Sequence, residues 1–236
     1  MSSESSRLLL ISASKADDTG YLTHAKAWLE DHIDGAELLF IPYAGVTVSH
    51  QDYTAKVRHA LADTSIQVRG IESFACPKQA IRDAKAIAVG GGNTFVLLNT
   101  LYQLGLLDLI RRKVQQGTPY VGWSAGSNIA GLSIRTTNDM PIVQPPSFNA
   151  LKLVPFQLNP HYTDFVPAGF HGETRDQRLA EFNQFDPHTP VLAIQEGTAL
   201  KIEGKRMQLL GHKPGYVFTR ERKLKLTPQR DCSQWL

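Results

Sequence analysis

The 236-residue sequence has few cysteines, little net charge and no long apolar run. Its two cysteines, Cys76 and Cys232, are far apart in the chain. We therefore expect free thiols in a reducing compartment, and neither a disulfide framework nor a cysteine-based metal site. The formal net charge is only +3, and Glu221 interrupts the basic stretch 220–225. Because nucleic-acid binding needs a clustered basic face, we expect a solvated tail and no nucleic-acid partner.

The first apolar run, residues 8–11, is too short to span a bilayer. The polar residues before it lack the basic start and the longer apolar region of a signal peptide. These features predict a cytoplasmic protein with no membrane partner. A chain of this length can bury a core without disulfides, and we expect residues 1–236 to form a single domain.

Short apolar runs alternate with helical patterns over the first half of the chain. We expect strands at 8–12, 37–43, 66–71, 86–89 and 120–123, and helices at 21–32, 52–62, 77–83, 94–104 and 107–116. This alternation predicts an α/β fold: a doubly wound, mostly parallel sheet with helices on both faces. After residue 131, repeated prolines predict loops. The apolar runs 191–194, 199–202, 207–210 and 216–219 then predict C-terminal β-hairpin strands.

Residues 122–126 (GWSAG) match the Gly-x-Ser-x-Gly pattern of a nucleophile turn. The pattern follows an apolar strand and precedes a segment that can open a helix, which is the context that it requires. Glycines are needed there because bulky side chains would collide with the neighbouring backbone on so sharp a turn. We predict Ser124 as the nucleophile; the alternative is a glycine turn used only for packing.

A second glycine turn, residues 90–92, follows the buried strand 86–89. Active sites of open parallel sheets lie at this carboxyl edge. We predict that the N–H groups of Gly92 and Ala125 form an oxyanion hole. A phosphate-binding loop is the alternative, but the glycine spacing fits neither the dinucleotide-binding pattern nor the P-loop.

A serine nucleophile needs a base, and the base needs a group that orients it. His161 follows the proline of a loop, and Glu196 ends the strand 191–194 just before Gly197. Taken alone, His161 can equally be a hydrogen-bonded histidine and Glu196 a solvated turn residue. The order serine, histidine, acid differs from that of the α/β-hydrolases. Five further histidines lie in polar or turn contexts and are expected to be solvated: His32, His50, His59, His188 and His212.

Several long motifs are shared with one peptidase family. They are 40–47 (FIPYAGVT), 89–95 (VGGGNTF), 122–128 (GWSAGSN), 134–142 (IRTTNDMPI), 159–161 (NPH) and 172–175 (GETR). From the first strand to about residue 218, the chain resembles the α-aspartyl dipeptidases (peptidase E) of the S51 serine peptidases. Ser127 stands where the pattern favours alanine, and residues 223–236 match nothing in it.

The resemblance implies a fold related to class I glutamine amidotransferases, with a catalytic triad of Ser124, His161 and Glu196. It also implies an enzyme that hydrolyses dipeptides with an N-terminal aspartate and that needs no metal or other cofactor. We expect the protein to be a monomer or a homodimer.

We expect a cation to bind the aspartyl side chain, and we predict that this cation is Arg175, because a guanidinium matches a carboxylate. Arg175 lies on an expected loop over 170–177, which Gly169 and Gly172 can let close over the substrate. A surface residue at a helix start is the alternative for Arg175. Asn93 and Asp139 are candidates for the substrate's amino group. Two other functions stay open: a related enzyme acting on another aspartyl substrate, such as a cyanophycin-like polymer, and a non-catalytic binding protein.

Overall fold

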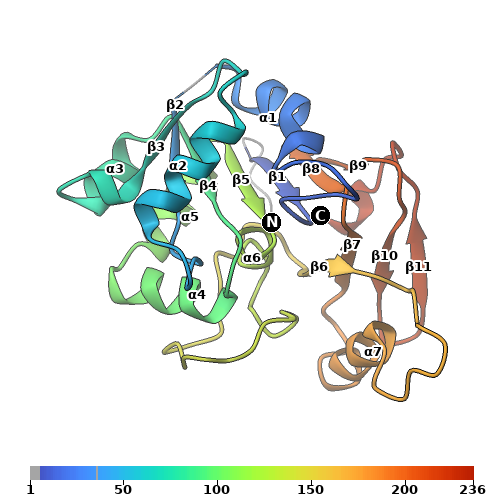
Figure 1. The fold of residues 1–236 in the computed structure, drawn as a ribbon. Helices are drawn as coiled ribbons and strands as arrows, with labels where there is room; N and C mark the ends of the chain where they lie inside the picture. The colour runs from blue at the N-terminus through green and yellow to red at the C-terminus, as the bar shows by residue number, and fades with distance from the viewer. Residues whose placement is uncertain (1–5, 36) are drawn as a thin grey trace.

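The computed structural model describes residues 6–35 and 37–236. A seven-stranded sheet with the order β3-β2-β4-β5-β1-β8-β9 lies at its centre (Figure 1). Its strands are β1 (Arg7–Ile11), β2 (Glu37–Ile41), β3 (Gln67–Gly70), β4 (Ala86–Val89), β5 (Tyr120–Trp123), β8 (Ala199–Glu203) and β9 (Arg206–Leu210). The strands from β3 to β1 are parallel, so their carboxyl ends share one edge of the sheet. The β8–β9 hairpin joins them antiparallel.

Helices cover both faces of this sheet. They are α1 (Lys26–Ile33), α2 (His50–Ala60), α3 (Pro77–Asp83), α4 (Thr94–Gln103), α5 (Leu107–Gln115) and the short α6 (Ala125–Asn128), with 3₁₀ turns at η1 (Thr23–Ala25), η2 (Ile71–Ser73) and η3 (Ser233–Trp235). The apolar sides of α1 and α2 pack on one face, and those of α3, α4 and α5 on the other. The predicted doubly wound α/β fold is confirmed. Within residues 6–35 and 37–236, no helix combines the length and apolarity needed to cross a bilayer.

A second, four-stranded sheet with the order β11-β10-β7-β6 lies beside the first (Figure 1). It consists of β6 (Gln157–Tyr162), β7 (Val191–Gln195), β10 (Gly215–Phe218) and β11 (Lys223–Leu226), and α7 (Arg175–Phe185) packs on it. Leu158, Leu192 and Val217 of this sheet belong to the same hydrophobic cluster as Leu8 and Leu10 of β1. The shared core supports one domain over residues 1–236, which stays a prediction.

The structure corrects the sequence analysis in the second half of the chain. The stretch expected as loops contains β6 and α7, and the expected solvated tail contains β11. His161 therefore lies on a strand, and Arg175 is the first residue of a helix and not part of a loop over 170–177. His32 is also not solvated, because it is fully buried against β5, where its Nε2 lies 3.2 Å from the carbonyl oxygen of Tyr120.

Candidate active site

Ser124 lies on a sharp turn between β5 and α6. Its backbone has φ 54° and ψ −115°, a conformation that non-glycine residues rarely adopt and that is typical of functional sites. The flanking glycines are required sterically. A Cβ on Gly122 would lie 2.4 Å from the Gly126 carbonyl group, and a Cβ on Gly126 would lie 2.0 Å from the Val89 oxygen. The turn holds the Ser124 hydroxyl at the carboxyl edge of the parallel sheet.

Ser124, His161 and Glu196 form one hydrogen-bonded series. The Nε2 atom of His161 lies 2.8 Å from the Ser124 Oγ, and its Nδ1 lies 2.6 Å from the Glu196 Oε1. An ionised carboxylate only accepts hydrogen bonds, so it favours the tautomer that carries the proton on Nδ1. The Nε2 lone pair then faces the serine hydroxyl. This arrangement fits a nucleophile, a general base and an orienting acid.

A bulge in β6 places the imidazole. The register between β6 and β7 shifts between Asn159 and Tyr162, so that His161 falls in the irregular part with a φ of 55°. Bulges of this kind redirect a side chain near an active site. Because β6 and β7 are parallel, His161 near the end of one and Glu196 just after the other share an edge of the second sheet.

Ser12, which sequence reasoning missed, links the two sheets. It follows β1 and is fully buried. Its Oγ accepts a hydrogen bond from the His161 N–H (2.9 Å) and donates one to the Ile194 carbonyl (2.8 Å). The only sequence feature that could have indicated a role for Ser12 is its position at the carboxyl end of a buried strand, because it belongs to no recognisable motif.

The glycine turn after β4 lies against the nucleophile. A Cβ on Gly91 would come within 2.9 Å of the Ser124 Cβ. Gly92 has a φ of 136°, and a Cβ there would lie 2.1 Å from the Ala44 carbonyl oxygen, so only glycine fits. Among the described residues, no hydrogen bond uses the N–H groups of Gly92 or Ala125. Free backbone donors at a turn and at a helix start suit a developing oxyanion.

A small pocket of about 20 Å³ beside Ser124 and Ala125 is lined by Asp139. The Oδ2 atom of Asp139 accepts hydrogen bonds from Thr94 N (2.8 Å) and Thr94 Oγ1 (2.5 Å) at the start of α4. No described residue donates to its Oδ1. Asn93 lies next to it, but its side chain caps α4 through Val96 N (3.1 Å). Asp139 therefore has a carboxylate oxygen available for a cationic ligand, whereas the Asn93 oxygen already accepts a hydrogen bond.

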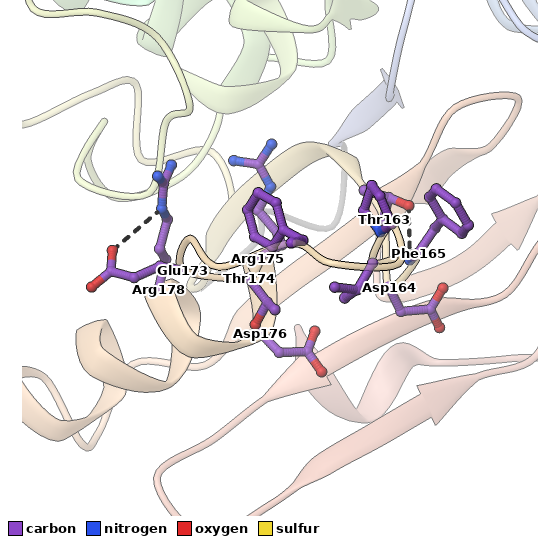
Figure 2. A pocket seen from close by; sticks show the side chains of 11 residues that line it. Thr163, Asp164, Phe165, Glu173, Thr174, Arg175, Asp176 and Arg178 are labelled. Atoms are coloured by element: carbon purple, nitrogen blue, oxygen red, sulfur yellow. Dashed lines mark hydrogen bonds and ion pairs between the residues drawn. The ribbon is translucent and has the colours of Figure 1, made fainter.

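Arg175 begins α7 after the capping residue Thr174. It lines a separate cavity of about 450 Å³ that contains neither Ser124 nor His161 (Figure 2). In Figure 2 its side chain extends to the same side as that of Arg178, away from Asp176. Its Nη1 donates a hydrogen bond to the Asn138 Oδ1, and Asn138 lines the small pocket beside Ser124. Arg175 therefore contacts a residue that lines the small pocket but does not line that pocket itself.

Burial lowers the pKa of Arg175, and the neighbouring Arg178 cation lowers it further. Both causes disfavour an unpaired cation, and Arg175 forms no ion pair within the described residues. A carboxylate ligand would relieve this cost.

Ser127, the departure from the expected alanine, faces the core and not the site. It is fully buried, and its hydroxyl lies 2.7 Å from the Ile11 carbonyl oxygen and 2.8 Å from that of Gly122. The described part of the chain has no group of three or more His, Cys, Asp or Glu side chains placed to hold a metal ion. The absence of a metal or cofactor requirement stays a prediction.

Comparisons with known proteins identify the family. The model of peptidase family S51 matches residues 8–210. Peptidase E of Shewanella denitrificans is 56% identical over 230 residues, which cover 97% of this chain and 98% of that protein. Peptidase E of Shewanella amazonensis is 57% identical over 213 residues, or 90% of this chain and 91% of that protein. The crystal structure of a peptidase from an acI-B1 Actinobacterium covers 96% of both chains with a TM-score of 0.72, and its 18% identity supports the fold alone. The chain is therefore a peptidase that belongs to peptidase family S51.

Proposed function

We propose that this peptidase is a serine dipeptidase that hydrolyses dipeptides with an N-terminal aspartate. The observation that carries the proposal is the series from the Ser124 Oγ to His161 (2.8 Å) and on to Glu196 (2.6 Å). Ser124 stands at its head on a strained turn between two sterically required glycines. A packing turn would need neither the strain nor the aligned imidazole.

In the proposed reaction, His161 takes the proton of Ser124 as the hydroxyl oxygen attacks the carbonyl carbon of the aspartyl residue. Glu196 holds the Nδ1 proton and stabilises the imidazolium. The N–H groups of Gly92 and Ala125 stabilise the oxyanion. His161 then protonates the leaving amine, the peptide C–N bond breaks, and water releases aspartate from the ester on Ser124.

Two charged side chains support the choice of aspartate. Arg175 is an unpaired, partly buried cation, and a guanidinium can bind a carboxylate through two hydrogen bonds. We propose that the aspartyl carboxylate replaces Asn138 as its partner. Asp139, which lines the small pocket beside Ser124, is proposed to bind the α-ammonium group. Asn93 lines a larger groove beside Ser124 and not this pocket, so it is a weaker candidate for that role.

The nucleophile is tested by replacing Ser124 with alanine. We expect loss of Asp-Leu hydrolysis and of labelling by a fluorophosphonate, with an unchanged circular dichroism spectrum. Ser127→Ala is the matched control, because it also removes a hydroxyl from this turn and helix but should keep activity. Retained turnover in Ser124→Ala would remove the mechanism.

Specificity is tested with dipeptides that begin with Asp, Glu, Asn or Ala. We expect Asp-Leu to be the preferred substrate, and Arg175→Ala to raise KM and lower kcat for it. Equal rates on all four dipeptides would refute the aspartate assignment. Preference for a longer, β-linked aspartyl polymer would instead support the cyanophycin-directed alternative.

A further inference from the structure

A second, larger groove that also borders Ser124 is not accounted for by aspartate recognition. It has a volume of about 570 Å³ and is lined by Ser124 and His161 together with Tyr21, Val46, Lys56 and Ile142. We call it the Lys56 groove. The small pocket with Asp139 also touches Ser124 and His161, so the two hollows adjoin the same pair of residues. A substrate whose first residue uses the small pocket would place its leaving residue in the Lys56 groove.

Lys56 gives the groove a positive charge. No Asp or Glu lines it, and its tyrosines stay neutral because burial raises the pKa of both Tyr21 and Tyr53. Lys56 forms no ion pair with any Asp or Glu among the described residues. The groove therefore favours an anion over a neutral or cationic group.

The ammonium group of Lys56 lies over one aromatic ring, that of Tyr21. Its Nζ lies 4.3 Å from the centre of the Tyr21 ring. The Tyr21 hydroxyl accepts a hydrogen bond from Trp123 Nε1 (3.1 Å) and donates one to the Tyr53 hydroxyl (3.2 Å). Trp123 directly precedes Ser124, so this chain of contacts ties Lys56 to the strand that carries the nucleophile.

We propose that Lys56 binds the free C-terminal carboxylate of the leaving residue and so restricts this peptidase to dipeptides. This inference rests on the proposed function. A dipeptide is a zwitterion with its cation on one side of the scissile bond and its anion about one residue, roughly 3.3–3.6 Å, beyond it. Asp139 and Lys56 line two different hollows that share Ser124 and His161, so a substrate that spans both hollows would meet an anion in one and a cation in the other. A longer peptide carries a neutral amide where the dipeptide carries its carboxylate.

The groove also suits an apolar leaving side chain. Val46, Val48 and Ile142 line it and are exposed by 55%, 37% and 60%. Apolar side chains exposed together at a groove commonly mark a binding surface. Leucine is therefore a suitable leaving residue for the test.

The test compares Asp-Leu with Asp-leucinamide, which differs only in lacking the carboxylate. We expect kcat/KM of the unaltered protein to be about tenfold higher for Asp-Leu than for Asp-leucinamide. One hydrogen bond between charged groups can supply a difference of this size. Lys56→Met should bring this ratio close to one, mainly through a higher KM for the acid. Lys56→Arg should keep most of the preference. About 0.5 M salt should weaken it, because Lys56 is exposed.

Lys85→Met is the matched control, because Lys85 is also exposed but precedes β4, at the opposite edge of the sheet from Ser124. It should keep the ratio of the unaltered protein. A ratio that survives in Lys56→Met, or a ratio near one in the unaltered protein, would overturn the inference while leaving the proposed function standing. If the unaltered protein cleaves neither substrate, the proposed function itself fails and the inference falls with it.

Discussion

Replacing Ser12 with alanine is expected to weaken both the fold and catalysis, although Ser12 touches no reacting atom. The Ser12 Oγ is fully buried between the His161 N–H and the Ile194 carbonyl. A buried group that loses its partner costs about 1–3 kcal/mol, so we expect a loss of about 2–4 kcal/mol in the free energy of unfolding. The bulge that aims His161 also loses its tie to β1. A misplacement of the imidazole by less than 1 Å should lower kcat by about 10–100-fold with little change in KM.

Urea unfolding measures the first effect, and the rate of fluorophosphonate labelling of Ser124 measures the second without assuming a peptide substrate. Ser127→Ala is the control, since it removes an equally buried hydroxyl. The Ile11 carbonyl would keep its hydrogen bond from Ser124 N (3.2 Å), and the Gly122 carbonyl would lose its contact with the hydroxyl (2.8 Å). We therefore expect a cost of about 1–2 kcal/mol, smaller than that of Ser12→Ala, and a normal labelling rate. If Ser12→Ala unfolds and reacts like the unaltered protein, the role assigned to this linkage is wrong.

Three further changes test other parts of the structure. Gly126→Ala should yield little folded protein, because its Cβ would lie 2.0 Å from the Val89 oxygen; a thermal melt equal to that of the unaltered protein would contradict the steric argument. Glu196→Gln should lower kcat by about 10²–10⁴-fold, since an amide can hold the wrong tautomer of His161, and a normal kcat would show that Glu196 does not orient the imidazole. Burial lowers the pKa of His32 to about 4, below its unfolded value near 6.5, so its contribution to stability is complete above pH 6.5 and is lost as the pH falls toward 4. Between pH 7.5 and 5 this amounts to about 2 kcal/mol, and a His32→Gln variant with the same pH dependence as the unaltered protein would exclude His32 as the cause.

Strands buried on both faces were predictable from the sequence. The ranges expected for β4 and β5 match the structure to the residue, because each apolar run stops at a sharp turn, at Gly90 after β4 and at Ser124 after β5. The range expected for α3 also matches, because Pro77 marks the start of that helix. The second half was harder to interpret. β6 contains Pro160 and a bulge, both of which break the alternation of a regular strand.

Charged side chains hid the strand β11. β11 alternates Lys223 and Lys225 with leucines on an edge of the second sheet, so it looked like a basic tail. Lys223 in fact pairs with Asp176 of α7 (2.8 Å), a contact that only the folded chain creates.

By itself, the sequence determined the nucleophile turn and the glycine turn. Each has a local signal: a Cβ on Gly122 would lie 2.4 Å from the Gly126 carbonyl group of the same turn, and Gly92 has a φ of 136°, which favours glycine. The contacts that leave no room for a Cβ on Gly126 and Gly92, with Val89 and Ala44, exist only in the folded chain. The tertiary structure decided what meets Ser124. His161 stands on β6 of the second sheet and Glu196 just after β7, and their approach to Ser124 depends on packing between the sheets and on the buried hydroxyl of Ser12. Contacts between residues so far apart in the chain leave no periodic or spacing pattern in the sequence, because they depend on the summed packing of both sheets and not on any local segment.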